Sequence, residues 1–195
     1  LSRANETLGL IVSEMQRPDL EIESSWLLNE RHYGSLQGQS RRDVSLRYGN
    51  ARVVSWRRDY RAKPPLQEAD DPHHPFLDPK YQHIDKSELP SSESLEDAAE
   101  RALRWWEKGI SPRLLSNQNI LVVAHTASLR GIVRVLEQLD DTQTENFRIA
   151  TCLPVIYEIE QDMNIIRKYE LPIGGLSWLR RQGSKLKPTK LFPWI

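Results

Sequence analysis

Residues 119–139, NILVVAHTASLRGIVRVLEQL, constrain the fold of this chain more than any other segment. Residues 120–124 form an unbroken apolar run rich in β-branched side chains, which is typical of a strand buried on both faces of a parallel sheet. From residue 129 the apolar side chains recur at the spacing of one helical face, and Thr126 or Ser128 can cap that helix. The segment therefore predicts a buried strand that leads directly into an amphipathic helix.

His125 stands at the carboxyl end of the predicted strand, beside the free amides of a helix N-terminus. Open α/β sheets bind ligands at this edge, and helix N-termini favour anions such as phosphate. Two interpretations stay open from this segment alone. His125 either faces a phosphate site or is a polar turn residue that covers the end of the strand.

Length and charge narrow the class of protein. A chain of 195 residues suits one domain with a sizeable core. Its 27 basic and 27 acidic residues cancel, and no apolar run approaches the roughly 20 residues that span a bilayer. One cysteine, Cys152, excludes an internal disulfide and is consistent with a reducing compartment. We therefore expect a cytoplasmic protein that binds neither nucleic acid nor membrane.

The remaining periodic segments predict an α/β succession. Helices are expected over residues 2–16 and 95–110, the second opened by a capping box of Ser94 and Asp97. Residues 26–28 suggest a short buried strand, and residues 35–61 are compatible with helix. Two further runs, at 153–159 and 165–171, suggest a hairpin at the edge of the sheet.

Residues 63–92 contain six prolines, which predict an irregular connection. A connection of this length is typical of an active-site lid. It carries His73, His74 and His83, whose spacing matches no common zinc motif. No metal site is therefore expected.

Two polar clusters are candidates for chemistry. Glu30 follows the apolar residues 26–28, and a carboxyl group that is partly desolvated there can serve as a general acid or base. Adjacent arginines such as Arg57 and Arg58 can clamp a small ligand that bears phosphate and carboxylate, at roughly 1.5–3 kcal/mol for each charged contact. The alternatives are a salt-bridged turn around Glu30 and a solvated basic helix face.

The clusters occur in an order that closely resembles the cofactor-dependent phosphoglycerate mutases of the histidine phosphatase superfamily. The resemblance extends over roughly residues 1–159 and is most specific in two segments, NERHYG at 29–34 and WRRDY at 56–60. The AH-x-x-SLRG segment at 124–131 adds a weaker match. This resemblance implies a three-layer α/β/α sandwich with a mostly parallel central sheet.

The resemblance also implies an activity, namely the interconversion of 3-phosphoglycerate and 2-phosphoglycerate in glycolysis through a phosphohistidine. The implied phosphoryl donor is 2,3-bisphosphoglycerate, the implied substrate is a small phosphorylated carboxylic acid, and a homodimer is expected. Glu30 would exchange protons with the substrate hydroxyl, and His125 would stabilise the transferring phosphoryl group. The implied substrate-binding residues are Arg3, Tyr33, Arg41, Arg57, Arg58 and Thr126.

The sequence departs from the family pattern at three points. The Arg-His-Gly motif of the first strand, which carries the nucleophilic histidine, is absent, so we expect an N-terminally incomplete domain over 1–171. Thr126 and Ala127 replace a Gly-Asn pair, and Arg41 replaces a lysine, as in the bisphosphoglycerate mutase branch. Residues 172–195 form a basic tail without a family counterpart. A bisphosphoglycerate mutase or phosphatase, and a catalytically inactive paralogue that acts as a binding protein, remain alternatives.

Overall fold

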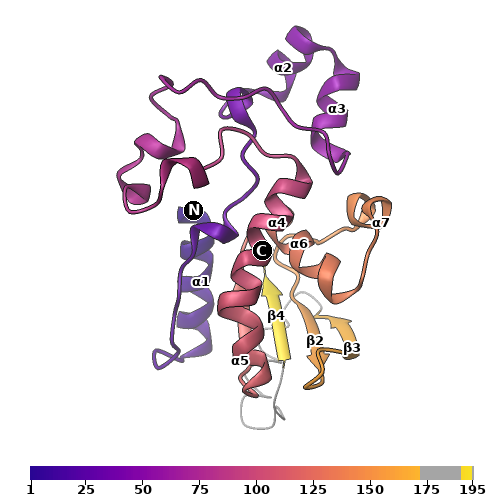
Figure 1. Cartoon of the computed structure of the whole chain (residues 1–195). Coiled ribbons are helices and arrows are strands. Elements are labelled where there is room, and N and C mark those ends of the chain that lie inside the picture. Colours follow the sequence, from indigo (N-terminus) through magenta and orange to yellow (C-terminus); the bar gives the residue numbers. More distant parts are fainter. Residues whose placement is uncertain (172–189, 195) are drawn as a thin grey trace.

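A computed structural model describes residues 1–171 and 190–194. These residues form an α/β arrangement of helices around one four-stranded sheet (Figure 1). The helices are α1 (Ser2–Met15), α2 (Arg41–Tyr48), α3 (Asn50–Arg58), α4 (Leu95–Trp105), α5 (Ser111–Leu115), α6 (Thr126–Leu136) and α7 (Asp141–Asn146), with a π-helical turn (Trp106–Ile110) between α4 and α5. The strands are β1 (Ile120–Val123), β2 (Val155–Ile159), β3 (Ile165–Glu170) and β4 (Lys190–Trp194).

The sheet has the strand order β1-β4-β2-β3. β1 and β4 are parallel, with Ile120 opposite Leu191, whereas β2 is antiparallel to both β4 and β3. The hairpin expected from residues 153–171 is confirmed. A mostly parallel sheet is not confirmed for the described strands, because only one of their three adjacent pairs is parallel.

β4 comes from residues 172–195, which we predicted from the sequence to be a basic tail outside the domain. Its backbone pairs with β1 on one side and with β2 on the other, so this part of the tail joins the sheet (Figure 1). The basic residues Arg180, Arg181, Lys185 and Lys187 lie outside the described residues. β4 therefore links β1, which precedes the predicted site, to the edge hairpin.

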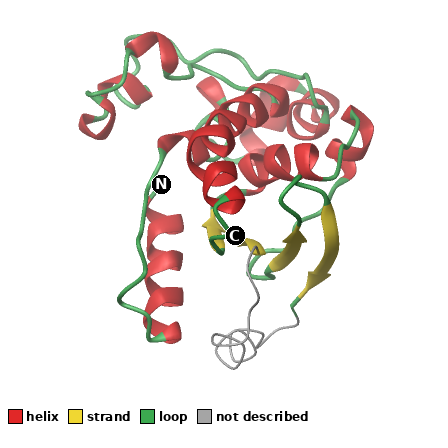
Figure 2. Ribbon diagram, turned by 60° about the horizontal axis from the view of Figure 1, so that its bottom comes forward, coloured by secondary structure: helices red, strands yellow, loops and turns green. Residues whose placement is uncertain are grey.

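The core lies on both faces of this sheet. Val122 of β1 and Tyr157 of β2 are buried with the apolar faces of α4 and α6, where Ile132 is fully buried. On the opposite face, Ile11 of α1 packs against Ile156 of β2. Figure 2 shows α1 standing on one side of the strands and apart from the other helices. The amphipathic helices predicted from periodicity thus cover the strands that the apolar runs predicted.

Two local predictions are wrong. Residues 26–28 form a 3₁₀ turn, not a strand, because Ser25 caps the turn by accepting the amide of Leu27 at 3.3 Å. Neither Thr126 nor Ser128 caps α6; His125 is the N-cap residue and its side chain makes no capping bond. The hydroxyl of Ser128 instead donates to the backbone carbonyl of Asn29 at 2.6 Å. The first difference comes from a local cap, and the second from a contact between segments far apart in the sequence.

The capping box at the start of α4 is confirmed, with Ser94 and Asp97 each accepting the backbone amide of the other. Residues 63–92 are irregular as expected and contain only 3₁₀ turns, at Pro75–Leu77, Pro79–Tyr81 and Lys86–Glu88. A further 3₁₀ turn, Gly34–Leu36, precedes α2. None of the helices in the described part of the chain is both long and apolar enough to cross a membrane.

The close contact of α4 with α6 generates the first testable prediction. A Cβ added at Gly131 would lie 2.6 Å from the Cα of Ala99, so Gly131→Ala must push the two helices apart. We expect this change to lower the free energy of unfolding by about 1–3 kcal/mol in urea denaturation. Gly9→Ala is the matched control: it lies in α1 with no atom within 4 Å of the new Cβ. The control should raise stability slightly, since alanine favours helix, and equal effects of the two changes would contradict the packing.

Candidate active site

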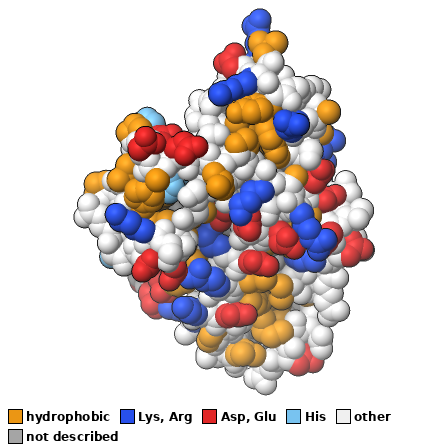
Figure 3. Space-filling model, turned by 45° about the horizontal axis from the view of Figure 1, so that its top comes forward, with side chains coloured by type: hydrophobic (Ala, Val, Ile, Leu, Met, Phe, Trp, Pro, Cys, Tyr) orange, Lys and Arg blue, Asp and Glu red, His pale blue; other side chains and the backbone are white. Residues whose placement is uncertain are grey.

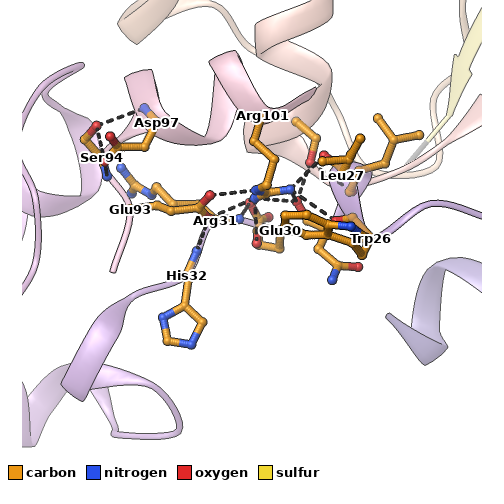
Figure 4. Close-up of polar contacts among 12 residues, drawn as sticks. Trp26, Leu27, Glu30, Arg31, His32, Glu93, Ser94, Asp97 and Arg101 are labelled. Atoms are coloured by element: carbon orange, nitrogen blue, oxygen red, sulfur yellow. Dashed lines mark hydrogen bonds and ion pairs between the residues drawn. The ribbon is translucent and has the colours of Figure 1, made fainter. Parts of the chain in front are cut away.

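A buried ion pair positions the loop that carries Glu30. Arg101 of α4 donates to both carboxylate oxygens of Glu93, at 2.6 and 2.8 Å, and both residues are almost fully buried. Glu93 also accepts the backbone amide of His32 at 2.8 Å, while its own amide donates to the carbonyl of His32. Figure 4 shows Arg101 between Glu93 and the residues that precede Glu30.

The guanidinium of Arg101 also forms hydrogen bonds with backbone carbonyls of the loop that carries Glu30. Its guanidinium donates to the carbonyls of Leu27, at 2.7 Å, and Asn29, at 3.1 Å, with longer bonds to those of Trp26 and Glu30 (Figure 4). Burying an ion pair is costly unless its remaining donors are satisfied. Here the loop carbonyls accept those donors, so the loop is fixed to α4.

Glu30 reaches the N-terminus of α6. Its Oε1 accepts the amide of Arg31 at 2.8 Å and the amide of Ala127 at 3.3 Å. Ala127 is two residues beyond His125, so the carboxyl group of Glu30 lies where β1 ends and α6 begins. The structure thus brings Glu30 to the start of α6, and the roles of Glu30 and His125 stay predictions.

His125 is 5% exposed, and its Nε2 is buried without a hydrogen-bond partner among the described residues. Burial, together with the positive charge of Arg3, lowers the pKa of this imidazole to about 4. The ring is therefore neutral at pH 7. An unpaired buried nitrogen is costly in the free protein and is available to a ligand atom.

Arginines dominate a neighbouring cavity of about 220 Å³. It is lined by Arg41, Val54, Arg57, Arg58, Arg130, Glu145 and Arg148. Five guanidinium groups and one carboxylate face this space, so its charge suits a small polyanion. The sequence predicted three of these arginines as ligand-binding residues, and the structure brings all three to one cavity.

Arg31 and Tyr33 connect the two parts of the site. The guanidinium of Arg31 lies 4.6 Å from the centre of the Tyr33 ring and donates to the Tyr33 hydroxyl at 2.9 Å. Arg57 approaches the same ring at 5.8 Å. Arg31 is buried, yet its Nε and Nη1 have no partner in the described part of the chain. These donors remain available beside Glu30.

The other predicted residues lie as follows. Arg3 is exposed on α1 and close enough to His125 to influence its pKa. Thr126 is the first residue of α6. Neither Arg3 nor Thr126 lines the arginine cavity, and Glu30 and His125 do not line it either. Within residues 1–171 and 190–194, no three histidine, cysteine, aspartate or glutamate side chains are grouped as a metal site would require.

The sequence did not identify Arg101 and Glu93, which hold the loop of Glu30 in place, or Arg148, which lines the cavity. Arg101 carried a signal, because it falls between Ala98 and Ala102 on the apolar face of α4, where a charge needs a buried partner. Arg148 follows α7 in an irregular segment, and only the tertiary structure brings it to Arg130.

The environment of His125 predicts an unusual titration. We expect its ring to take up a proton near pH 4, not near the ordinary 6.5, in an NMR titration of the histidine ring signals. Because the unfolded chain binds this proton more readily between pH 6.5 and 4, protonation favours unfolding as the pH falls. The unfolding free energy should therefore decline more steeply over that range than in His125→Gln. A ring that titrates near 6.5 would show that His125 is not desolvated.

The buried ion pair of Arg101 and Glu93 generates a third prediction. Arg101→Lys keeps the charge but cannot contact Glu93 and the loop carbonyls at once, so we expect a loss of about 3 kcal/mol in chemical denaturation. Arg61→Lys is the matched control, because Arg61 also forms ion pairs, with Glu96 and Asp141, but is exposed. Its unfolding midpoint should hardly move, since exposed ion pairs contribute little. Similar midpoints for both variants would refute the role of Arg101.

Comparisons with known proteins agree with this geometry. Residues 65–172 match the model of the histidine phosphatase superfamily (branch 1). The chain is 39% identical over 171 residues to the 2,3-bisphosphoglycerate-dependent phosphoglycerate mutase of Borreliella burgdorferi (strain ZS7), covering 88% of this chain and 69% of that protein. The proteins of the same name from Borreliella afzelii (strain PKo) and Borrelia garinii subsp. bavariensis are 39% and 38% identical over the same shares. The chain therefore belongs to the 2,3-bisphosphoglycerate-dependent phosphoglycerate mutase family of the histidine phosphatase superfamily.

Proposed function

We propose that this protein is a phosphoglycerate mutase that interconverts 3-phosphoglycerate and 2-phosphoglycerate. One observation carries the proposal: Glu30 accepts the amide of Ala127 beside a buried, neutral His125, and an arginine-lined cavity adjoins them. Catalysis of phosphoryl transfer depends mainly on positioning the reacting groups and on positive charge around the transferring phosphoryl group. Family membership supports the same activity.

The residues fit a small molecule that carries phosphate and carboxylate. Arg41, Arg57 and Arg58 offer charged donors from α2 and α3, and Arg31, which follows Glu30 in the chain, has two buried donors without a partner among the described residues. When bound, 2,3-bisphosphoglycerate supplies the phosphoryl group for the reaction. The cavity arginines and Arg31 would hold its anionic groups, and contacts with Tyr33 position Arg31.

Glu30 is the acid and base of the proposal. Its carboxylate is half-buried and held on one oxygen by two backbone amides, which leaves the second oxygen for a substrate hydroxyl. His125 offers Nε2 to an equatorial oxygen of the moving phosphoryl group. Arg3 adds positive charge on the same side. The chemistry would pass through a phosphohistidine, as the resemblance implies.

A second candidate is a bisphosphoglycerate mutase or phosphatase, which Arg41 favours because it lines the cavity where the family pattern has a lysine. A third candidate is a catalytically inactive binding protein. It is favoured by Thr126 and Ala127 at the start of α6, which replace the Gly-Asn pair of the family pattern. Product analysis with the full-length protein separates the three. Transfer of a labelled phosphoryl group from 2,3-bisphosphoglycerate to a histidine supports either enzyme, and absence of that label favours the binding protein.

We also propose that the whole domain is a three-layer α/β/α sandwich. The packing of α1 against one face of the sheet and of α4 and α6 against the other supports it. Exposed apolar side chains on α1 and β3, such as Leu10 and Ile166, are consistent with the expected homodimer. The cytoplasmic location and the substrate, a small phosphorylated acid, follow from the proposed glycolytic reaction.

Glu30→Gln tests the proposed chemistry. The amide cannot take or return the hydroxyl proton, so we expect turnover by the full-length protein to fall roughly 100-fold to 10,000-fold. The dissociation constant for 3-phosphoglycerate should hardly change, because the arginines that hold the anion remain. Glu14→Gln, an exposed position on α1, is the control and should keep full activity. Unchanged turnover in Glu30→Gln would exclude the acid–base role.

A further inference from the structure

Asn29, which directly precedes Glu30, is held by groups from α4, from α6 and from the irregular segment 63–92. Its backbone carbonyl accepts hydrogen bonds from Arg101, at 3.1 Å, and from the hydroxyl of Ser128, at 2.6 Å. Its side-chain amide donates to the hydroxyl of Tyr81 at 2.9 Å. The two helices therefore fix the backbone beside Glu30, and the irregular segment holds the side chain.

Residues 66–91, here called the flap, leave the body of the protein at a closed base. The hydroxyl of Ser92 donates to the carbonyl of Pro64 at 2.8 Å, which joins the two ends of the flap. The base also presses on Gly34, where an added Cβ would lie 1.9 Å from the carbonyl oxygen of Pro65. The flap is thus anchored beside the segment that carries Glu30.

The flap packs on its own side chains. His74 is 2% exposed, its Nε2 lies 3.0 Å from the hydroxyl of Ser91, and its ring centre lies 3.9 Å from that of Phe76. Figure 3 shows this part of the chain as a lobe that projects from the body and carries apolar, acidic and histidine side chains. The flap is therefore a preformed unit, and its place on the body depends on the contacts that it makes there.

Away from its base, the flap contacts the body at Tyr81 and at Glu88. Glu88 forms an ion pair with Arg104 of α4, but both side chains are exposed, and exposed ion pairs contribute little. Tyr81 is half-buried and ends the 3₁₀ turn Pro79–Tyr81, which is capped by the carboxylate of Asp78. A capped turn presents the phenol to Asn29, so the Tyr81 contact is the more specific of the two.

We propose that Tyr81 is a positioning residue for Glu30: its hydroxyl joins the flap to Asn29 and so helps to hold the carboxyl group of Glu30 at the amide of Ala127. A single neutral hydrogen bond is weak enough to break and re-form during turnover. Without it, Asn29 keeps its backbone contacts with α4 and α6 but loses the contact that orients its side chain. The inference rests on the proposed function, because it gives the flap a part in the acid–base step.

The NMR signal of the Ala127 backbone amide tests this role without any turnover. In Tyr81→Phe, which removes the hydroxyl and keeps the ring, we expect the signal to move part of the way from its wild-type position to its position in Glu30→Ala. Tyr48→Phe is the matched control, because it removes a hydroxyl from α2, where the ring of Tyr48 packs against Trp56. An Ala127 signal that stays in place in Tyr81→Phe would overturn the positioning role.

Steady-state kinetics of the full-length protein test the consequence for the reaction. We expect Tyr81→Phe to lower kcat about threefold to tenfold, the size of effect that the loss of one neutral hydrogen bond produces. The KM for 3-phosphoglycerate should change less than about twofold, because the arginines of the cavity remain. Tyr48→Phe should match the wild type in both constants.

Asn29→Ala tests whether Tyr81 acts through Asn29. This change removes the other partner of the hydrogen bond, together with a contact between the Asn29 side chain and the amino group of Leu1 at 3.0 Å. Tyr81→Phe should therefore lower kcat no further when it is added to Asn29→Ala. A further loss as large as that in the wild-type background would show that Tyr81 acts elsewhere, which would overturn the proposal.

This inference and the proposed function fail in different ways. If Glu30→Gln abolishes turnover but Tyr81→Phe matches Tyr48→Phe in kcat and in the Ala127 signal, the positioning role is wrong and the proposed function stands. If Tyr81→Phe moves the Ala127 signal but Glu30→Gln keeps full turnover, Tyr81 does position Glu30 and the acid–base role of Glu30 fails.

Discussion

The bidentate pair between Arg101 and Glu93 is the interaction on which the site depends. Residues 26–32 have no strand ladder to satisfy their carbonyls, and Arg101 supplies the donors that a neighbouring strand would otherwise supply. One buried guanidinium on α4 thus fixes the backbone that presents Glu30. Because α4 packs directly on α6, the same helix also fixes the distance from Glu30 to the start of α6, where His125 lies.

The site contains two electrostatic environments, and each suits a different kind of chemistry. At the sheet edge, burial keeps His125 neutral, and backbone amides hold Glu30, so proton exchange is the available chemistry. In the cavity, guanidinium groups accumulate without balancing carboxylates, so anion binding is the available chemistry. Arg31 joins the two, since it contacts Tyr33 and lies beside Glu30. Five of the 27 basic residues of this chain, whose formal net charge is zero, thus line one cavity.

The sequence predicted elements with strong local signals and missed those decided by distant contacts. The strand and helix over residues 119–139, the capping box at Ser94 and the edge hairpin were correct because their periodicity or spacing is local. Residues 26–28 were wrongly predicted because three apolar residues do not distinguish a strand from a 3₁₀ turn. Residues 172–195 were predicted to be a basic tail, yet β4 lies between β1 and β2, because its place depends on pairing with strands far away in the sequence. In the site, the motif residues were predicted from the sequence. The place of Arg148 in the cavity and the hydrogen bond from Ser128 to Asn29 were not predicted, because both depend on contacts that form only in the folded chain.

The most direct test is the NMR signal of the Ala127 backbone amide at neutral pH in the wild type and in Glu30→Ala. We predict that removing the carboxylate shifts this signal clearly, since Glu30 accepts that amide. Arg101→Lys, which loosens the loop that carries Glu30, should shift the signal in the same direction and by less, and Glu14→Ala should leave it in place. An Ala127 signal that is identical in the wild type and in Glu30→Ala would show that the carboxyl group does not reach the start of α6, which would contradict the shared site.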